Sequence, residues 1–271
     1  MREITERRNK VVMKKNECTI LVMGCDEYVD VLELNAIFKE RYWKGCSFEY
    51  VLVTQTITPE NNVYDKIIKT SKDTPWMQRL ETALQEVKTP FVCIMCDDYF
   101  YSQKVCEKFF YDSIEKMKEN NIGLLKIVPT NFFRQFKIID RVYKEYKKDN
   151  AFRISYYPSI WNVEYLKKFS GSGYSVWEAE RKNSVSSKAY QEKIWTVRKN
   201  ELKIVHAIMA GCWTRETIQF FRREKIESKL YASRKVKSIK MYLKDAIYNI
   251  LMTIAPDFIL NMQETLKIGR H

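Results

Sequence analysis

The stretch TPFVCIMCDDYFYS, residues 89–102, joins an apolar run to an abrupt acidic end. Residues 91–96 are continuously apolar, the adjacent carboxylates Asp97 and Asp98 follow them, and three aromatic residues come next. Such a run is typical of a strand that is buried on both faces of a sheet. In open α/β sheets, ligands bind beyond the carboxyl ends of the strands, so the two carboxylates would lie where a ligand site is expected.

The segments around this stretch alternate between strand-like and helix-like patterns. Upstream, CTILVMGCDEY (18–28) is an apolar run that closes in Gly24, Asp26 and Glu27. Apolar spacing predicts helices over 28–43, 75–87 and 104–120, and further apolar runs predict strands over 48–56 and 122–129. This alternation predicts an α/β protein with a mostly parallel central sheet flanked by helices.

Two strands of this predicted sheet deliver acidic side chains to the same edge. Asp26 and Glu27 follow the first strand, and Asp97 and Asp98 follow the strand over 90–96. Oxygen ligands suit Mg²⁺ or Mn²⁺, and such a cation would in turn hold a diphosphate. The alternative is that the aspartates only start a loop or cap the next helix. The second acidic strand end upstream favours a site.

Composition limits the classes of function. The net charge of +13 implies an anionic partner, such as nucleic acid, anionic lipid or a phosphorylated substrate. The seven cysteines include one lone C-x-x-C pair, Cys93 and Cys96, inside an apolar run, which favours buried thiols in a reducing cytoplasm. With only two histidines, chemistry built on several histidines is excluded. Neither a signal peptide nor a transmembrane helix is expected.

Four segments in order resemble GT-A fold glycosyltransferases, in particular bacterial enzymes that build capsule or lipopolysaccharide chains. They are TILVMGCDEY, then WMQRLETALQEVKTPFVCIMCDDYF, then FRISYYPSIWNVEYLKKF with YSVWEAE, and last IVHAIMAGCW, which together span about residues 18–215. The acidic motif of the family usually reads Asp-x-Asp. Here it reads Asp-Asp-Tyr, which leaves open whether Asp97 or Asp98 holds the metal.

The resemblance implies a nucleoside-diphosphate sugar donor, most often a UDP-sugar, with Mn²⁺ or Mg²⁺. The loop with Gly24, Asp26 and Glu27 would lie against the nucleoside, and Asp97 and Asp98 would bind the ribose and the metal-diphosphate. A late histidine completes the metal shell in some members of the family. This makes His206 a candidate ligand, although a lone histidine in an apolar run is more often a core residue.

The resemblance also implies a domain plan with a GT-A-like catalytic domain over residues 1–220. Its nucleotide-sugar half would cover about 17–130 and its acceptor half about 131–220. A basic amphipathic helical tail would follow over 221–271.

A second acidic pair, Glu178 and Glu180, lies in GYSVWEAERK (173–182). An inverting transferase needs one base to take the proton from the acceptor hydroxyl. The resemblance makes Glu180 the candidate base, and Glu178 would orient the acceptor or Glu180. The alternative is a solvated helical face with local ion pairs. Trp161 and Trp177 are candidates for stacking on an acceptor sugar, with packing in the core as the alternative.

The tail pattern predicts a basic amphipathic helix. Residues 220–244 carry nine Lys or Arg against two Glu, and apolar residues recur at three- and four-residue spacing over 239–254. The helix would break near Pro256, and a short second helix would follow over 257–268. Residues 222–262 would bind an anionic membrane surface. The alternative is packing on the catalytic domain or on a second subunit, in a possible homo-oligomer; nucleic-acid binding is not expected.

These patterns favour a glycosyltransferase on the inner face of the cell membrane that extends a lipid-linked surface glycan. The first alternative is a sugar-phosphate nucleotidyltransferase, which would also use aspartates and a metal. The second is a non-enzymatic basic protein that binds membrane or nucleic acid.

Overall fold

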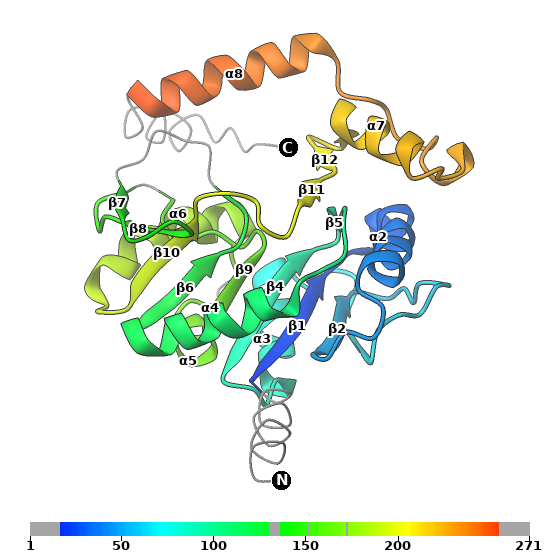
Figure 1. The fold of residues 1–271 in the computed structure, drawn as a ribbon. Coiled ribbons are helices and arrows are strands. Elements are labelled where there is room, and N and C mark those ends of the chain that lie inside the picture. The colour runs from blue at the N-terminus through cyan, green and yellow to red at the C-terminus, as the bar shows by residue number, and fades with distance from the viewer. Residues whose placement is uncertain (1–16, 130–135, 151, 172, 255–271) are drawn as a thin grey trace, which may run out of the picture. The chain divides into compact units, whose positions relative to one another are not determined.

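The computed structural model describes residues 17–129, 136–150, 152–171 and 173–254 (Figure 1). The chain divides into two compact units. The first contains residues 1–129 and 136–204, and the second contains 130–135 and 205–271. This division comes earlier in the chain than the start of the tail expected at residue 221, and the expected domain limits stay a prediction.

The first unit is built on a nine-stranded sheet with the order β3-β2-β1-β4-β9-β6-β10-β8-β7. Its strands are β1 (Cys18–Met23), β2 (Glu49–Thr54), β3 (Lys66–Lys69), β4 (Phe91–Cys96), β6 (Ile122–Lys126), β7 (Phe136–Ile138), β8 (Tyr143–Tyr146), β9 (Ser159–Asn162) and β10 (Lys193–Val197). β3, β2, β1 and β4 pair in parallel, as do β6 and β10, and β8 and β9 run against the other strands. The predicted α/β fold with a mostly parallel sheet is therefore confirmed.

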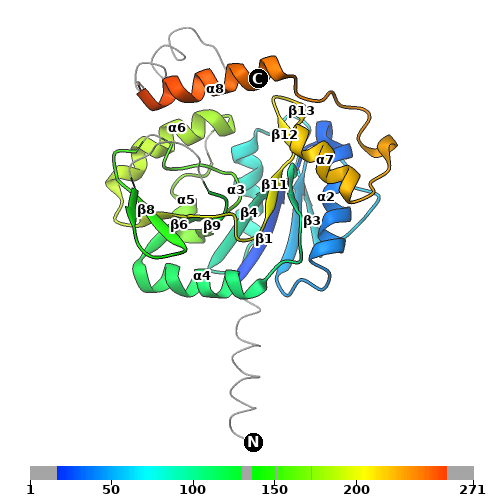
Figure 2. The ribbon, with the colours of Figure 1, turned by 45° about the horizontal axis from the view of Figure 1, so that its top comes forward.

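Helices cover both faces of this sheet (Figure 2). One face packs against α2 (Val29–Tyr42) and α4 (Glu107–Asn120), and the other packs against α3 (Trp76–Glu86), α5 (Val163–Lys167) and α6 (Val176–Ser186). Alternate residues of β1 point to opposite faces of the sheet. Ile20 packs in the hydrophobic core on the side of α2 and α4, and Leu21 packs in the core on the side of α3, α5 and α6. A strand buried on both faces has no polar side, which explains the continuous apolar runs.

The structure confirms the helices and strands that the sequence predicts up to residue 126. At most of their ends, the observed boundary lies within one to three residues of the predicted one. It adds β9, which the sequence did not indicate, between β4 and β6 and antiparallel to both. Trp161 of β9 is 0% exposed and stacks on Tyr156 with ring centroids 5.5 Å apart. Its indole N–H donates to the Ser159 hydroxyl at 2.9 Å. The expectation that Trp161 stacks on an acceptor sugar is wrong, because both faces of its strand lie in the core.

One glycine allows close packing of helix on sheet. A Cβ at Gly123 of β6 would lie 2.3 Å from the ring of Tyr165 in α5. Backbone and ring can meet there only without a side chain. Tyr165 is consequently buried, and it extends the aromatic cluster around Trp161.

The second unit contains β12 (Ile208–Met209), β13 (Cys212–Trp213), α7 (Arg215–Arg223), the short helix η3 (Ser228–Leu230) and α8 (Ile239–Ile254); β11 (Ile204–His206) lies at the boundary between the units. Ala210 and Gly211, both with positive φ, turn β12 into β13. The helix predicted over 239–254 is confirmed as α8. Pro256 and the helix expected over 257–268 lie outside the described residues. Within the described ranges, every helix is too short or too polar to cross a bilayer.

Substitution of Trp161 and of Trp177 should change the stability of the protein by very different amounts. Trp161→Ala should lower the free energy of unfolding by about 3–5 kcal/mol, because it empties a buried aromatic site. Trp177→Ala should change it by less than about 0.5 kcal/mol, because Trp177 is 57% exposed. Urea unfolding of both variants measures the difference, and equal effects would contradict the assignment of Trp161 to the core.

Candidate active site

The acidic pair lies at the carboxyl end of β4, beside the end of β1. Asp97 is 7% exposed, and its N–H donates to the Met23 carbonyl at 3.2 Å, which joins the two strand ends. From α2, the buried Asn35 amide donates to the carbonyls of Asp97 at 2.9 Å and Tyr99 at 3.2 Å. Backbone pairing and one buried amide thus fix the position of the acidic turn, which leads into β5 (Tyr99–Tyr101).

The surroundings of this turn disfavour the ionised form of Asp97 next to the Asp98 carboxylate. Burial, followed by the neighbouring Asp98 carboxylate, raises the pKa of Asp97 well above its ordinary value. Arg79 and the N–H groups of Asp98 and Cys25 act in the opposite direction. The compensation is therefore incomplete, and a cation at this position would stabilise the ionised pair.

Arg79 of α3 is a buried cation close to the acidic turn. It is 6% exposed, and its Nη1 donates to the Gly24 carbonyl. Burial lowers its pKa, while the charges of Cys25, Asp97 and Asp26 oppose that shift. Arg79 thus ties the loop after β1 to α3 and places a positive charge near Asp97. The sequence analysis missed Arg79 and Asn35; the available signal was a polar residue on the apolar face of each predicted helix.

The loop after β1 is held by hydrogen bonds to the segment that follows β2. Asp26 accepts from the N–H of Thr56 at 2.9 Å and of Ile57 at 3.2 Å, and the Thr56 hydroxyl, as the largest cause, lowers the pKa of Asp26. Gly24 is buried, and a Cβ there would press on Leu32 at 3.0 Å. Glu27 is exposed. The expected contact of Gly24, Asp26 and Glu27 with a nucleoside stays a prediction.

Glu180 of α6 reaches the same edge of the sheet through the backbone of Tyr156. The Tyr156 N–H donates to the Glu180 carboxylate at 2.8 Å, and the Tyr156 carbonyl accepts from the Cys96 thiol at 3.5 Å. After burial, Asp98 is the largest cause of the raised pKa values of Cys96 and Tyr99, and Glu180 adds to both. The Tyr156 backbone therefore links Glu180 of α6 to Cys96, the residue directly before Asp97, although these residues lie more than 80 positions apart in the chain.

The loop that carries Tyr156 is fixed to both the sheet and α6. Buried Lys126 of β6 donates to the Phe152 carbonyl at 3.1 Å, and Phe152 has a left-handed φ of 50°. The Ile154 N–H donates to the Ser184 hydroxyl of α6 at 3.0 Å. These contacts hold the loop on both the sheet and α6, so the Glu180 carboxylate faces an ordered backbone amide.

Glu178 has a different environment from Glu180. The stretch is helical, so residues two apart diverge, and Glu178 lies at the third helical position behind the N-cap Ser175. Its carboxylate accepts from the Ser175 N–H at 3.0 Å and from the Ser175 hydroxyl at 2.8 Å. This is a capping box, in which each residue satisfies a terminal N–H of the other. The geometry gives Glu178 a role at the helix end and separates it from the Glu180 carboxylate.

Two remaining candidate residues are exposed. Trp177 of α6 keeps a free face and can contact a ligand. His206 of β11 belongs to the second unit, and its role as a metal ligand stays a prediction. Among the described residues, no group of three or more His, Cys, Asp or Glu side chains is already arranged around a metal position.

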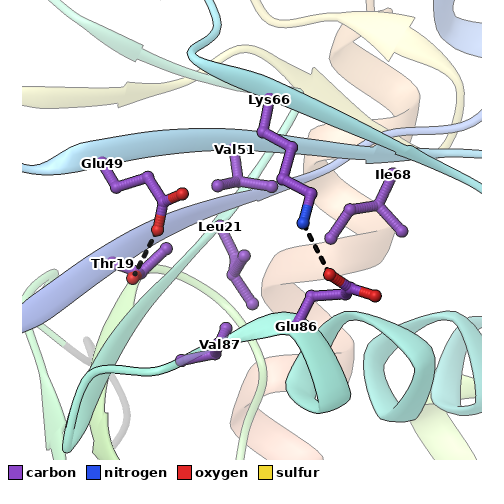
Figure 3. Close-up of a pocket in the computed structure, with 8 residues that line it drawn as sticks. All are labelled: Thr19, Leu21, Glu49, Val51, Lys66, Ile68, Glu86 and Val87. Atoms are coloured by element: carbon purple, nitrogen blue, oxygen red, sulfur yellow. Dashed lines mark hydrogen bonds and ion pairs between the residues drawn. The ribbon is translucent and has the colours of Figure 1, made fainter.

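A small gap lies away from the acidic edge, between β1, β2, β3 and the end of α3 (Figure 3). Lys66 and Glu86, which line it, form an ion pair of 2.6 Å. Glu49 and Lys66 are the first residues of β2 and β3, so the gap lies toward the opposite ends of the strands from Asp97. It takes no part in the acidic site.

Comparisons with known proteins give structural likenesses only. No protein-family model and no curated protein matches the chain. Among solved structures, S. aureus TarS matches at 14% identity and a TM-score of 0.47, over 76% of this chain and 38% of that one. A shorter TarS structure in complex with UDP-GlcNAc matches at 14% identity and 0.45, over 76% of this chain and 65% of that one.

A third similar structure is the mannosyltransferase PcManGT from Pyrobaculum calidifontis in complex with GDP-Man and Mn²⁺. It matches at 9% identity and a TM-score of 0.48, over 78% of this chain and 64% of that one. This chain therefore spans between 38% and 65% of the length of the chains in these three structures. All three TM-scores are below 0.5, so these likenesses do not assign an activity to this chain.

The capping box predicts a specific pH dependence of stability. The Ser175 hydroxyl and N–H lower the pKa of Glu178, so the ionised carboxylate stabilises the folded state above the unfolded pKa. This stabilisation is lost as the pH falls through the folded pKa. Glu178→Gln keeps the capping geometry without the charge, so it should cost about 0.5 kcal/mol at neutral pH and nothing in acid. Urea unfolding from neutral pH to below pH ~4 tests this expectation.

Proposed function

We propose that the protein is a glycosyltransferase that moves a hexose from a nucleoside-diphosphate sugar, preferably a UDP-sugar, to a hydroxyl of an acceptor glycan. The observation that carries the proposal is the position of Asp97 and Asp98 at the carboxyl end of β4, with Glu180 linked to the same strand end through the Tyr156 backbone and Cys96. Ligands of open α/β sheets bind at this edge. The two aspartates suit the donor diphosphate with its cation, and Glu180 suits the acceptor hydroxyl.

The donor set fits Mn²⁺ or Mg²⁺. Two adjacent carboxylates, one of them buried and with a raised pKa, form a site where a divalent cation would relieve the repulsion between like charges. Mg²⁺ is usually held by one or two carboxylates together with substrate phosphates, so a cage of three protein ligands is not required. Asp97 and Asp98 would hold the ion. When bound, it would stabilise the negative charge that develops on the leaving diphosphate.

In the transfer step the residues of the chain have separate roles. Glu180 takes the proton of the acceptor hydroxyl, and the acceptor oxygen bonds to the anomeric carbon from the face opposite the diphosphate. The bond between the anomeric carbon and the diphosphate oxygen breaks, and the nucleoside diphosphate leaves with the electron pair. The anomeric configuration inverts. Trp177 offers an exposed ring on which the acceptor sugar can stack.

The acceptor we propose is a lipid-linked glycan of the bacterial cell surface, such as a growing capsule or lipopolysaccharide chain. The protein would then work as a peripheral protein on the inner face of the cell membrane. The basic composition of the chain supports this placement, because an anionic lipid surface attracts a protein with a net charge of +13.

Nucleotide binding tests the donor part of the proposal. UDP with Mn²⁺ should raise the melting temperature of the wild type, equivalent to about 2.7 kcal/mol at a ligand concentration about 100 times Kd. Asp98→Asn should abolish the shift without a comparable loss of unligated stability. Asp112→Asn, a matched change on the exposed side of α4, should keep it. The absence of a shift with UDP and with other nucleoside diphosphates would contradict the proposal.

Substitution of the proposed base tests the transfer step. Glu180→Gln should lower kcat by about 10²–10⁴-fold, because it removes the proton acceptor, and should leave the UDP-dependent thermal shift unchanged. Glu164→Gln on the exposed face of α5 is the matched control and should keep the wild-type kcat. The readout is release of the nucleoside diphosphate in the presence of acceptor. Wild-type turnover by Glu180→Gln would remove Glu180 from the reaction.

A further inference from the structure

Helix α8 of the second unit exposes a continuous apolar stripe. Six large apolar side chains are between 44% and 75% exposed, and they recur at three- and four-residue spacing: Ile239, Leu243, Ile247, Ile250, Leu251 and Ile254. At 3.6 residues per turn, this spacing places all six on one side of the helix. We refer to these residues as the α8 stripe. A monomeric soluble protein rarely exposes a contiguous patch of this kind without an interaction partner.

The opposite side of α8 is fastened to the rest of the second unit. The Tyr242 hydroxyl donates to Glu216 of α7 at 3.0 Å and accepts from the Arg215 N–H at 3.0 Å. Lys237, which is 1% exposed, pairs with Asp245 and lies 3.5 Å from the Met209 sulfur of β12. These contacts orient α8 on α7 and the β12–β13 hairpin with the α8 stripe turned outward.

The segment before α8 reinforces this orientation. The N–H of Trp213 donates to the Lys235 carbonyl at 2.9 Å, and the N–H of Lys237 donates back to the Trp213 carbonyl at 2.9 Å. The chain therefore enters α8 along β13, whose Trp213 is fully buried. A helix held at its start and along its polar side cannot turn its apolar side inward without breaking these bonds.

The charge around the α8 stripe indicates which surface it fits. Lys240 and Lys244 are exposed on α8 next to the stripe, while Asp245, the acidic residue of the helix, is paired with Lys237. The described part of the second unit has ten Lys or Arg against four Asp or Glu. An apolar stripe with flanking lysines matches the acyl boundary and the anionic headgroups of a membrane.

We infer that α8 binds flat on an anionic membrane, with the α8 stripe in the acyl boundary and Lys240 and Lys244 at the headgroups. Membrane binding by α8 does not depend on the proposed transferase activity. The proposed location of the enzyme on the membrane, in contrast, depends on membrane binding. The second unit would serve as the membrane-binding platform of the chain.

Vesicle co-sedimentation of the full chain tests the inference. The wild type should bind vesicles of phosphatidylcholine mixed with phosphatidylglycerol and should bind pure phosphatidylcholine much more weakly. Leu243→Gln and Ile247→Gln should each lower the partition coefficient by about tenfold, because each removes a buried apolar side chain from the lipid. Lys240→Gln and Lys244→Gln should each lower it by about fivefold, and added salt should reduce this charge effect.

Matched controls separate membrane binding from general effects. Val185→Gln on α6 removes a side chain that is 68% exposed, and Lys108→Gln on α4 removes an exposed charge, so both should bind vesicles as the wild type does. All of these variants should keep the UDP-dependent thermal shift. Loss of that shift in the wild type would count against the proposed function and not against membrane binding.

Three outcomes would overturn the inference. The first is that the wild type fails to bind the anionic vesicles, or that the stripe variants bind as well as the wild type. The second is a concentration-dependent dimer in analytical ultracentrifugation that Leu243→Gln dissociates, without vesicle binding, which would assign the α8 stripe to a second copy. The third is a melting temperature lowered by Leu243→Gln far more than by Val185→Gln, which would assign the stripe to contacts within the chain.

Discussion

The burial of the Asp97 carboxylate at the joined ends of β1 and β4 is the constraint on which the candidate site depends. Removing a carboxylate from water is costly unless hydrogen bonds or opposite charges compensate. Here Arg79 and two backbone N–H groups compensate only in part, since the pKa of Asp97 stays raised. Asn35 and the Met23 carbonyl bind only the backbone of Asp97, so they fix its position without neutralising it. The fold thus holds a carboxylate where a cation would improve its stability.

The same edge depends on long-range contacts made by main-chain groups. Tyr156 uses its N–H for Glu180 and its carbonyl for Cys96, so one peptide segment links α6 to the end of β4. Lys126 holds the start of that segment through the Phe152 carbonyl. Because β9 follows directly and pairs with both β4 and β6, the sheet itself sets the position of the loop. The proposed base is therefore positioned by the scaffold rather than by its own helix alone, as a preorganised site requires.

Sequence patterns predicted the first half of the fold well because its strands are buried on both faces and its helices are long. The same patterns could not predict β9, a four-residue strand inside an aromatic stretch, so they left open whether Trp161 stacks on a sugar or packs in the core. Periodicity carries little information in a strand this short. The S-x-x-E spacing of Ser175 and Glu178 is a capping-box signature that predicts the start of α6 from sequence alone. Asn35 and Arg79 act on loops distant in sequence, and a single sequence does not identify such contacts.

Helix α8 shows a second limit of pattern analysis, because an amphipathic sequence does not say which face is buried. A surface helix of a globular protein ordinarily buries its apolar stripe and exposes its polar side. In α8 the order is reversed, since Tyr242 and Asp245 face α7 and the buried Lys237, and the α8 stripe is exposed. Exposing six large apolar side chains to water is unfavourable by an amount that grows with their area. The specific polar contacts on the other side keep the helix in this orientation, so a reversed amphipathic helix is best explained by an apolar surface outside the unit.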